Sequence, residues 1–324
     1  MAAIFTVLCH DQKLYDEFIT NKQYEAREST IAKYQYNFNY LILPTFSNVR
    51  IDKLTAVSIQ KWKLLMEEKG LSYNTKKKAF NDFQTALNYA VMMEYIPKNP
   101  LSKIGNFKSK VTITQEMTIY TAQDFIKFIG TAKRISEEHQ EKQYDLTEWD
   151  YYVFFNIAFY TGLRKGEILA LKWSDIDGEY LSLKRSISQK LKGGDRETPP
   201  KNKSSIRTLQ MPINLIKILQ EHKERQKQLI HFTDGYRICG GERPIREATA
   251  HYKNKLYAAK SGLKKIRIHD FRHSHVSLLA NEGINIQEVA RRLGHARIEI
   301  TWNTYSHLYP REEEKAIGVL NKII

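Results

Sequence analysis

The segment LGHARIEITWNTY occupies residues 293–305. Two earlier segments are also dense in side chains that can bind or act on a phosphate: TGLRKGE at 161–167 and HDFRHSH at 269–275. These segments bring together arginine, which binds phosphate through paired hydrogen bonds, and histidine, which exchanges protons near neutral pH. The packing of helices and strands alone does not demand such a density of these side chains. The segments therefore indicate one site that acts on a phosphate group.

Each motif also has a purely structural interpretation when it is taken alone. An arginine after TGL more often caps a helix, a single His-x-x-Arg is commonplace, and a tyrosine on an amphipathic helix usually belongs to the core. The functional interpretation depends on the occurrence of all of them, in this order, within one basic chain.

The order and spacing resemble the tyrosine recombinase family, whose pattern is an Arg, a distant His-x-x-Arg, a Gly-His and a Tyr shortly beyond. The family also has a catalytic Lys in a β-hairpin, which PPKNKSSIRTLQMP at 199–212 resembles. Lys201 aligns best with that lysine, and Lys203 is its competitor. The resemblance covers residues 118–310 and implies these catalytic residues: Arg164, Lys201, His269, Arg272, His295 and Tyr305.

Attack on a phosphodiester places negative charge on the nonbridging oxygens, so Arg164 and Arg272 are expected to bind them. Tyr305 is the expected nucleophile, and His269 is the expected acceptor of its proton. Lys201 is expected to protonate the departing 5′ oxygen, and His295 to hydrogen-bond the phosphate.

Other residues of the motifs have supporting roles in this interpretation. Glu167 and Asp270 are expected to hold an Arg or His in place rather than to react. His269 and His273 have the spacing of a metal-binding pair, but the sequence offers no third ligand, so no metal is expected.

The resemblance implies no cofactor, because a 3′-phosphotyrosine keeps the energy of the broken bond. The sequence agrees, since it has no GxxxxGK[ST] phosphate loop and no carboxylate cluster of the two-metal kind. Cys9 and Cys239 are expected to be ordinary reduced thiols.

The local patterns predict a mainly α fold with a small antiparallel β-sheet. Residues 180–187 and 205–211 alternate around a Gly193-Gly194 turn, which predicts strands between the helices of a mixed α+β catalytic domain. Helices are expected from about Thr30 to Tyr40, with a stop at Pro44, and from Ser72 to Tyr95.

We expect a helical core-binding, SAM-like domain over 1–96 and a linker over 97–117, where prolines, a glycine and lysines cluster. The catalytic domain is expected over 118–310 and a tail over 311–324. The tail is amphipathic, and the family commonly docks such a tail on a neighbouring subunit. Many family members carry an arm-site DNA-binding domain before the core-binding unit, whereas only residues 1–10 precede the first expected helix, which fits either a short natural form or a truncated chain.

The charge favours a nucleic-acid partner. The formal net charge is +15, with 16 basic against 10 acidic residues up to Lys110 and 35 against 26 beyond it, so both expected domains are basic. No stretch is apolar enough to span a membrane, and the N-terminus does not resemble a secretory signal, so a cytoplasmic, nucleoid-associated protein is expected. The expected DNA-binding residues are Lys76, Lys77, Lys78, Lys203 and Arg207.

KNKSSIRT, TGLRKGE and TWNTYSHL resemble integrases of temperate phages and conjugative transposons of Gram-positive bacteria. The resemblance implies a site-specific recombinase that integrates and excises a mobile element, acting as a homotetramer on double-stranded attachment sites. Excisionase or a host DNA-bending protein are further partners in this interpretation.

Two other functions remain open at this point. A type IB topoisomerase shares the nucleophile but relaxes supercoils as a monomer. A helix-turn-helix regulator would use ARRLGH at 290–295, but it leaves Arg164, Lys201 and Tyr305 unexplained.

Overall fold

The computed structural model describes residues 11–109, 118–142, 147–189, 194–199, 203–309 and 313–322. Its contacts divide the chain into two compact units, Met1–Thr114 and Gln115–Ile324. Each unit buries a hydrophobic core of its own.

The first unit is helical, and its helix starts follow local sequence signals. Thr55 closes a capping box with Ser58, and Ser72 accepts a hydrogen bond from the backbone N–H of Thr75 at 3.2 Å, as the N-cap preference for hydroxyl side chains predicts. The helices are α1 (Asp11–Glu25), α2 (Glu28–Asn37), α3 (Leu43–Phe46), α4 (Ala56–Glu68) and α5 (Tyr73–Met92).

Pro44 does not stop the helical path, contrary to the sequence-based expectation. After α2 the chain continues through a π-helical turn, Phe38–Ile42, directly into α3. Pro44 lies in the first turn of α3, inside this continuous helical path rather than at its end.

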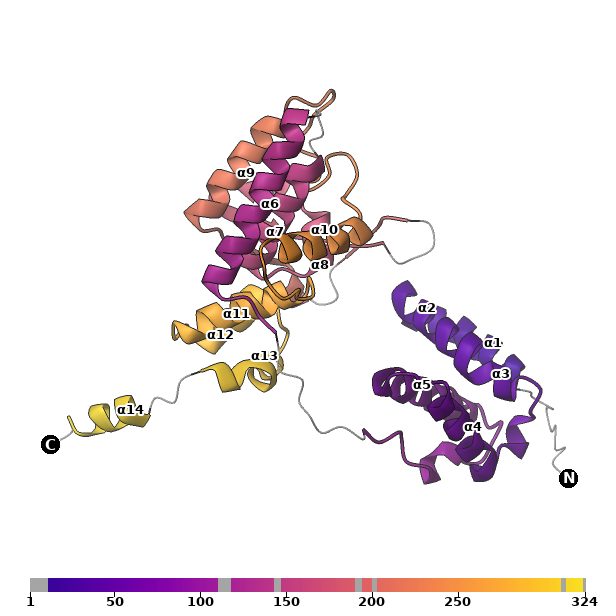
Figure 1. Cartoon of the computed structure of the whole chain (residues 1–324). Coiled ribbons are helices and arrows are strands. Elements are labelled where there is room, and N and C mark those ends of the chain that lie inside the picture. The colour runs from indigo at the N-terminus through magenta and orange to yellow at the C-terminus, as the bar shows by residue number, and fades with distance from the viewer. Residues whose placement is uncertain are drawn as a thin grey trace, which may run out of the picture. The chain divides into compact units, whose positions relative to one another are not determined.

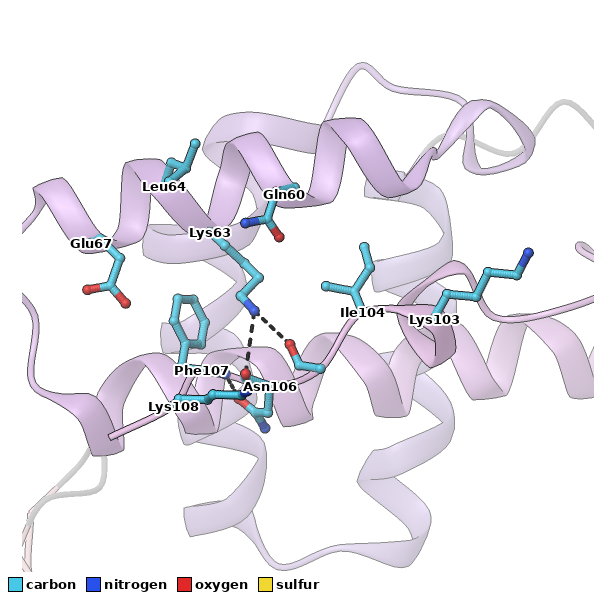
Figure 2. A pocket seen from close by; sticks show the side chains of 10 residues that line it. Gln60, Lys63, Leu64, Glu67, Lys103, Ile104, Asn106, Phe107 and Lys108 are labelled. Carbon is cyan, nitrogen blue, oxygen red and sulfur yellow. Dashed lines mark hydrogen bonds between the residues drawn. The ribbon is translucent and has the colours of Figure 1, made fainter. Parts of the chain in front are cut away.

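The described part of the expected linker is folded onto the first unit. Leu101 and Phe107 are buried in its core, and the Lys63 ammonium donates to the carbonyl oxygens of Gly105 at 2.6 Å and Asn106 at 3.4 Å. Figure 2 shows Lys63 and its hydrogen bonds among the residues that line a groove. The volume of this groove is about 520 Å³. Burial lowers the pKa of Lys63. Prolines and lysines therefore did not mark an extended chain at 97–109, because its few apolar residues suffice to anchor it.

The second unit is built around α7 (Thr147–Thr161), which is apolar on nearly all sides and buried along most of its length. It contacts α6, α9 and α11 (Figure 1). The other helices are α6 (Ala122–Lys142), α8 (Lys165–Ala170), α9 (Ile213–Gln226), α10 (Glu247–Lys260), α11 (Asp270–Asn281), α12 (Ile286–Leu293), α13 (Ile298–Tyr305) and α14 (Glu313–Leu320).

Short antiparallel strands separate α8 from α9. One sheet has the order β1-β2-β5, with Leu183 opposite Arg207, and a two-stranded sheet pairs β3 with β4. The strands are β1 (Ile176–Asp177), β2 (Tyr180–Leu183), β3 (Ser186–Ser188), β4 (Arg196–Thr198) and β5 (Arg207–Gln210).

The expected fold class is confirmed: the chain is mainly helical with small antiparallel sheets in the second unit. Among the described residues, no helix combines the length and apolar character that crossing a bilayer requires.

Candidate active site

The TGLR segment forms the turn between α7 and α8. Gly162 has a φ of +63°, and a Cβ there would lie 2.7 Å from Cδ2 of His275, so this position requires glycine. The turn makes Arg164 the N-cap residue of α8. Glu167 accepts hydrogen bonds from the backbone N–H of Arg164 at 2.9 Å and from its Nη1 at 3.1 Å, so the predicted positioning role of Glu167 has a structural basis.

Arg207 on β5 also binds the carboxylate of Glu167. Its guanidinium donates to both oxygens of Glu167, at 3.3 and 3.2 Å, and to the carbonyl oxygen of Arg292 at 2.7 Å. Burial alone would raise the pKa of Glu167, but the charge and hydrogen bonds of Arg207, together with Arg164, lower it below its ordinary value.

The expected DNA contact of Arg207 is not supported by this arrangement. Its side chain is only 6% exposed, and its guanidinium is directed to protein oxygens rather than to solvent. Gly294, at φ +64°, is needed beside it, because a Cβ would lie 2.6 Å from Nη1 of Arg207. Arg207 therefore links β5, α8 and the end of α12.

Arg272 connects the three sequence motifs. It lies on α11, is buried, and donates to the carbonyl oxygens of Gly162 and Leu293, each at 2.8 Å. Its Nη2 also lies 2.8 Å from Nε2 of His295. Burial, followed by the charge of Arg164, lowers the pKa of Arg272 to about 9. The structure thus brings together residues that the sequence places far apart.

His295 is oriented by a residue that the sequence analysis did not single out. Its Nδ1 lies 2.7 Å from Oγ1 of Thr301, which is fully buried on α13. Because Nε2 faces the donor Arg272, it must accept, and Nδ1 then carries the hydrogen and donates to Thr301. Burial, reinforced by nearby arginines, lowers the pKa of His295 to about 4.

Tyr305 ends α13 and is 2% exposed, packed with Val276, Val289 and Leu293. Its Oη lies 2.6 Å from Nδ1 of His273. Burial raises the pKa of Tyr305 to about 12, although the positive charge of Arg272 acts in the opposite direction.

The hydrogen-bond partner of Tyr305 is therefore His273, whereas the motifs predicted His269. Within the described residues, no hydrogen bond joins His269 to Tyr305, and His269 is exposed at the start of α11. The two histidine rings meet edge to face, with centroids 5.1 Å apart. Their separation of one helical turn was visible in the sequence, but only as possible metal spacing.

The remaining predicted residues of the second unit have different outcomes. Asp270 pairs with Arg267, which is largely exposed, rather than with Arg272 or His269. Lys201 lies outside the described residues, and Lys203 begins a short 3-10 helix, Lys203–Ser205. Among the described residues, no group of three His, Cys, Asp or Glu side chains is placed to hold a metal ion.

The lysines at the start of α5 differ from one another. Lys76 is buried and paired with Glu67, so its expected contact with DNA is not supported. Lys77 is exposed, with Nζ 5.6 Å from the ring centroid of Tyr73. Lys78 is half exposed and paired with Asp82.

The sequence of the chain is similar to those of known integrases and recombinases. The Phage integrase family matches residues 131–312, and the Phage integrase N-terminal SAM-like domain matches residues 12–63. The ICEBs1 integrase of Bacillus subtilis is 29% identical, covering 95% of this chain and 81% of its own length. A XerC-like tyrosine recombinase of Caldanaerobacter subterraneus is 31% identical, with 92% and 78% covered.

Solved structures have the same fold. The Tn1549 transposon integrase in complex with a circular intermediate DNA has a TM-score of 0.75 at 21% identity, covering 97% of this chain and 99% of its own. A lambda integrase dimer bound to a core site has a TM-score of 0.64 at 17% identity, with 94% and 78% covered.

Proposed function

The chain belongs to the phage integrase family and is a tyrosine-type site-specific recombinase, and from this premise we propose that Tyr305 attacks the scissile phosphate to form a 3′-phosphotyrosine. The observation that carries the proposal is the set of bonds from Arg272 to Gly162, Leu293 and His295, which join the three motifs at one place. The proposed catalytic residues are Arg164, Lys201, His269, Arg272, His295 and Tyr305.

Arg164 and Arg272 bind the nonbridging oxygens of the phosphate. Arg164 keeps part of its side chain exposed, while Glu167 fixes its orientation. Arg272 is held rigidly by backbone carbonyls, so little reorganisation is needed when charge develops on the phosphate. His295 lies beside Arg272, and its Nε2 can donate to a phosphate oxygen once the neutral ring moves its hydrogen from Nδ1 to Nε2, with Nδ1 then accepting from the hydroxyl of Thr301.

In the proposed reaction, one P–O bond forms as another breaks, so the energy of the phosphodiester is kept in the phosphotyrosine. Tyr305 forms the P–O bond as the 5′ oxygen leaves, and Lys201, with Lys203 as its competitor, supplies the proton to that oxygen. Attack by a 5′ hydroxyl from another strand reverses the step, so rejoining needs neither nucleotide hydrolysis nor a metal.

The partner is double-stranded DNA with attachment sites, and the product is an integrated or excised mobile element. The net charge of +15 supports binding to DNA, and relatives have been solved on DNA as a dimer and as a tetramer. We assign core binding to the first unit and catalysis to the second, with residues 311–324 docking on a neighbouring subunit of a homotetramer. Ile317 and Leu320 of α14 are exposed, which supports that docking.

The place of action is the bacterial nucleoid in the cytoplasm, where the substrate is found. An excisionase or a host DNA-bending protein would set the direction of the reaction. The assigned place of action and the assigned protein partners both follow from the reaction that we propose.

The test uses attachment-site DNA nicked just 3′ of the scissile phosphate, so that the cleaved fragment diffuses away and the adduct accumulates. We expect a covalent adduct that resists SDS, formed without added metal and absent for Tyr305→Phe. Absence of the adduct on DNA that the protein demonstrably binds would contradict the proposal. Relaxation of supercoiled DNA without a defined site would instead indicate a topoisomerase.

A further inference from the structure

The hydrogen bond between Tyr305 and His273 points to a different proton acceptor from His269, the residue that the recombinase motifs predicted. We infer that His273 orients the phenol of Tyr305 and accepts its proton during attack on the phosphate. The inference rests on the proposed function, since it concerns the activation of the same nucleophile.

The geometry places His273 at the reacting atom. Its Nδ1 lies 2.6 Å from the phenolic oxygen, and the ring centroids are 5.5 Å apart. His273 follows Arg272 directly on α11, so the group that binds the phosphate and the group that contacts the nucleophile come from consecutive residues. A candidate base must lie within hydrogen-bond reach of the proton that it takes, and among the described residues His273 satisfies this for Tyr305.

The protonation state of His273 suits an acceptor. Burial lowers its pKa below the ordinary histidine value, so the ring is neutral near pH 7. In the neutral ring, Nε2 carries the hydrogen and Nδ1 accepts from the phenol. The titratable and charged groups that face it are Asp270, which acts to raise its pKa, Arg267 and Arg272, which act to lower it, His269 through its ring, and Tyr305 from α13.

Tyr305 needs such a partner because burial raises its pKa to about 12, so few molecules carry a phenolate at neutral pH. In the step that we infer, the phenolic proton moves to Nδ1 of His273 while the Tyr305 oxygen bonds to phosphorus. The bond from phosphorus to the 5′ oxygen breaks, and the general acid protonates that oxygen. The imidazolium that forms is stabilised by the negative charge of Asp270.

His269 is less suited to this task in the described structure. It is exposed at the N-cap position of α11, and among the described residues its ring contacts that of His273 rather than that of Tyr305. An exposed His269 remains available to the phosphate. His273 thus takes the role of proton acceptor that the motifs predicted for His269, and His269 is left to contact the phosphate.

The experiment compares His273→Asn, which keeps an acceptor atom but cannot hold a proton, with His273→Ala, which removes both. The matched control is His231→Asn, because His231 is an exposed histidine with a positive φ that asparagine tolerates. Single-turnover cleavage of the nicked substrate is measured from pH 5 to 9, with DNA binding and circular dichroism as checks of folding.

We expect His273→Asn to slow cleavage by about 10²-fold or more, the usual scale of general-base catalysis. The wild-type rate should fall as the pH drops through the lowered pKa of His273, and this acid limb should be lost in His273→Asn. His231→Asn should keep the wild-type rate and profile.

A substrate with sulfur at the bridging 5′ position separates the two proton transfers, since a thiolate leaves without a proton. Sulfur should rescue Lys201→Ala but not His273→Asn. Wild-type rates for His273→Asn, or rescue of it by sulfur, would overturn the inference. If either result is found while the wild type forms an adduct and Tyr305→Phe does not, only the role of His273 is overturned. If the wild type forms no adduct, the proposed function itself fails.

Discussion

The two units hold their positive charges in different ways. In the second unit, Arg272 and Arg207 are buried and fixed by carbonyl and carboxylate oxygens from several elements. At the start of α5 in the first unit, Lys77 is exposed and Lys78 has a single neighbouring carboxylate. Charges that must stabilise a transition state need a fixed geometry, whereas charges that attract DNA need only proximity.

The difference predicts that substitutions in the two units will have effects of unequal size. Removal of a buried charge that makes several hydrogen bonds leaves its partners buried without a counter-charge or a hydrogen bond. The loss of folding free energy is then several times larger than for removal of a solvated charge.

The largest effect is expected for Arg272→Ala. The substitution removes the proposed phosphate donor and also the bonds that join the motif segments, so single-turnover cleavage should fall by about 10³-fold. Arg272→Lys should be nearly as defective, because an ammonium cannot reproduce the forked geometry. A loss smaller than tenfold in either variant would show that the buried network does not position the phosphate.

The next effect is expected for Glu167→Gln, measured as the free energy of unfolding in urea. The change leaves the buried guanidinium of Arg207 without its counter-charge and should cost about 3 kcal/mol. The matched control is Glu288→Gln, which breaks an exposed pair with Arg291 and should cost less than about 1 kcal/mol. Equal losses in the two variants would remove the distinction between buried and exposed pairs.

Much of the candidate site could be predicted from the sequence, because its residues lie in short local motifs of fixed spacing. The structure joins Arg272 to His295 and places Tyr305 beside α11, as the order of the motifs predicted. The helix start at Ser72 was also predicted from the sequence, and Ser72 is the N-cap of α5.

What the sequence could not supply were partners from distant elements. The inward direction of Arg207 depends on Glu167, which approaches from α8, and that of Lys76 depends on Glu67 on α4. The hydrogen bond of His273 depends on where α13 ends. A local pattern specifies which face of an element is apolar but not which neighbour meets its polar groups.

A smaller effect is expected for the pH dependence of stability that is caused by His275, which is buried against the TGLR turn. Burial lowers the pKa of His275 to about 3, and its Nδ1 hydrogen-bonds the carbonyl oxygen of Phe159. The unfolded chain therefore binds a proton at His275 more readily than the folded chain does. The free energy of unfolding is highest above the ordinary histidine pKa, and it decreases as the pH falls towards the pKa of His275 in the folded protein. Between pH 7 and pH 5 the loss should reach about 2 kcal/mol.

His275→Asn keeps a donor for Phe159 but does not titrate, so its stability in urea should fall less over the same pH interval. His295 also has a lowered pKa and contributes alike in both proteins, which leaves the difference to His275. An equal acid dependence in the two proteins would contradict the assignment.

The smallest effect is expected at the start of α5, where Lys77→Ala and Lys76→Ala form a matched pair. Exposed Lys77 can release a counterion when it meets a DNA phosphate, so its loss should reduce the slope of log Kd against log salt concentration by about 0.9. Lys76 is held by Glu67 inside the unit, so Lys76→Ala should leave the slope unchanged and lower the stability instead. The opposite pattern would mean that the ion pair of Lys76 opens on DNA. In that case the first unit, like the second, would present a charge that its fold holds in place before DNA binds.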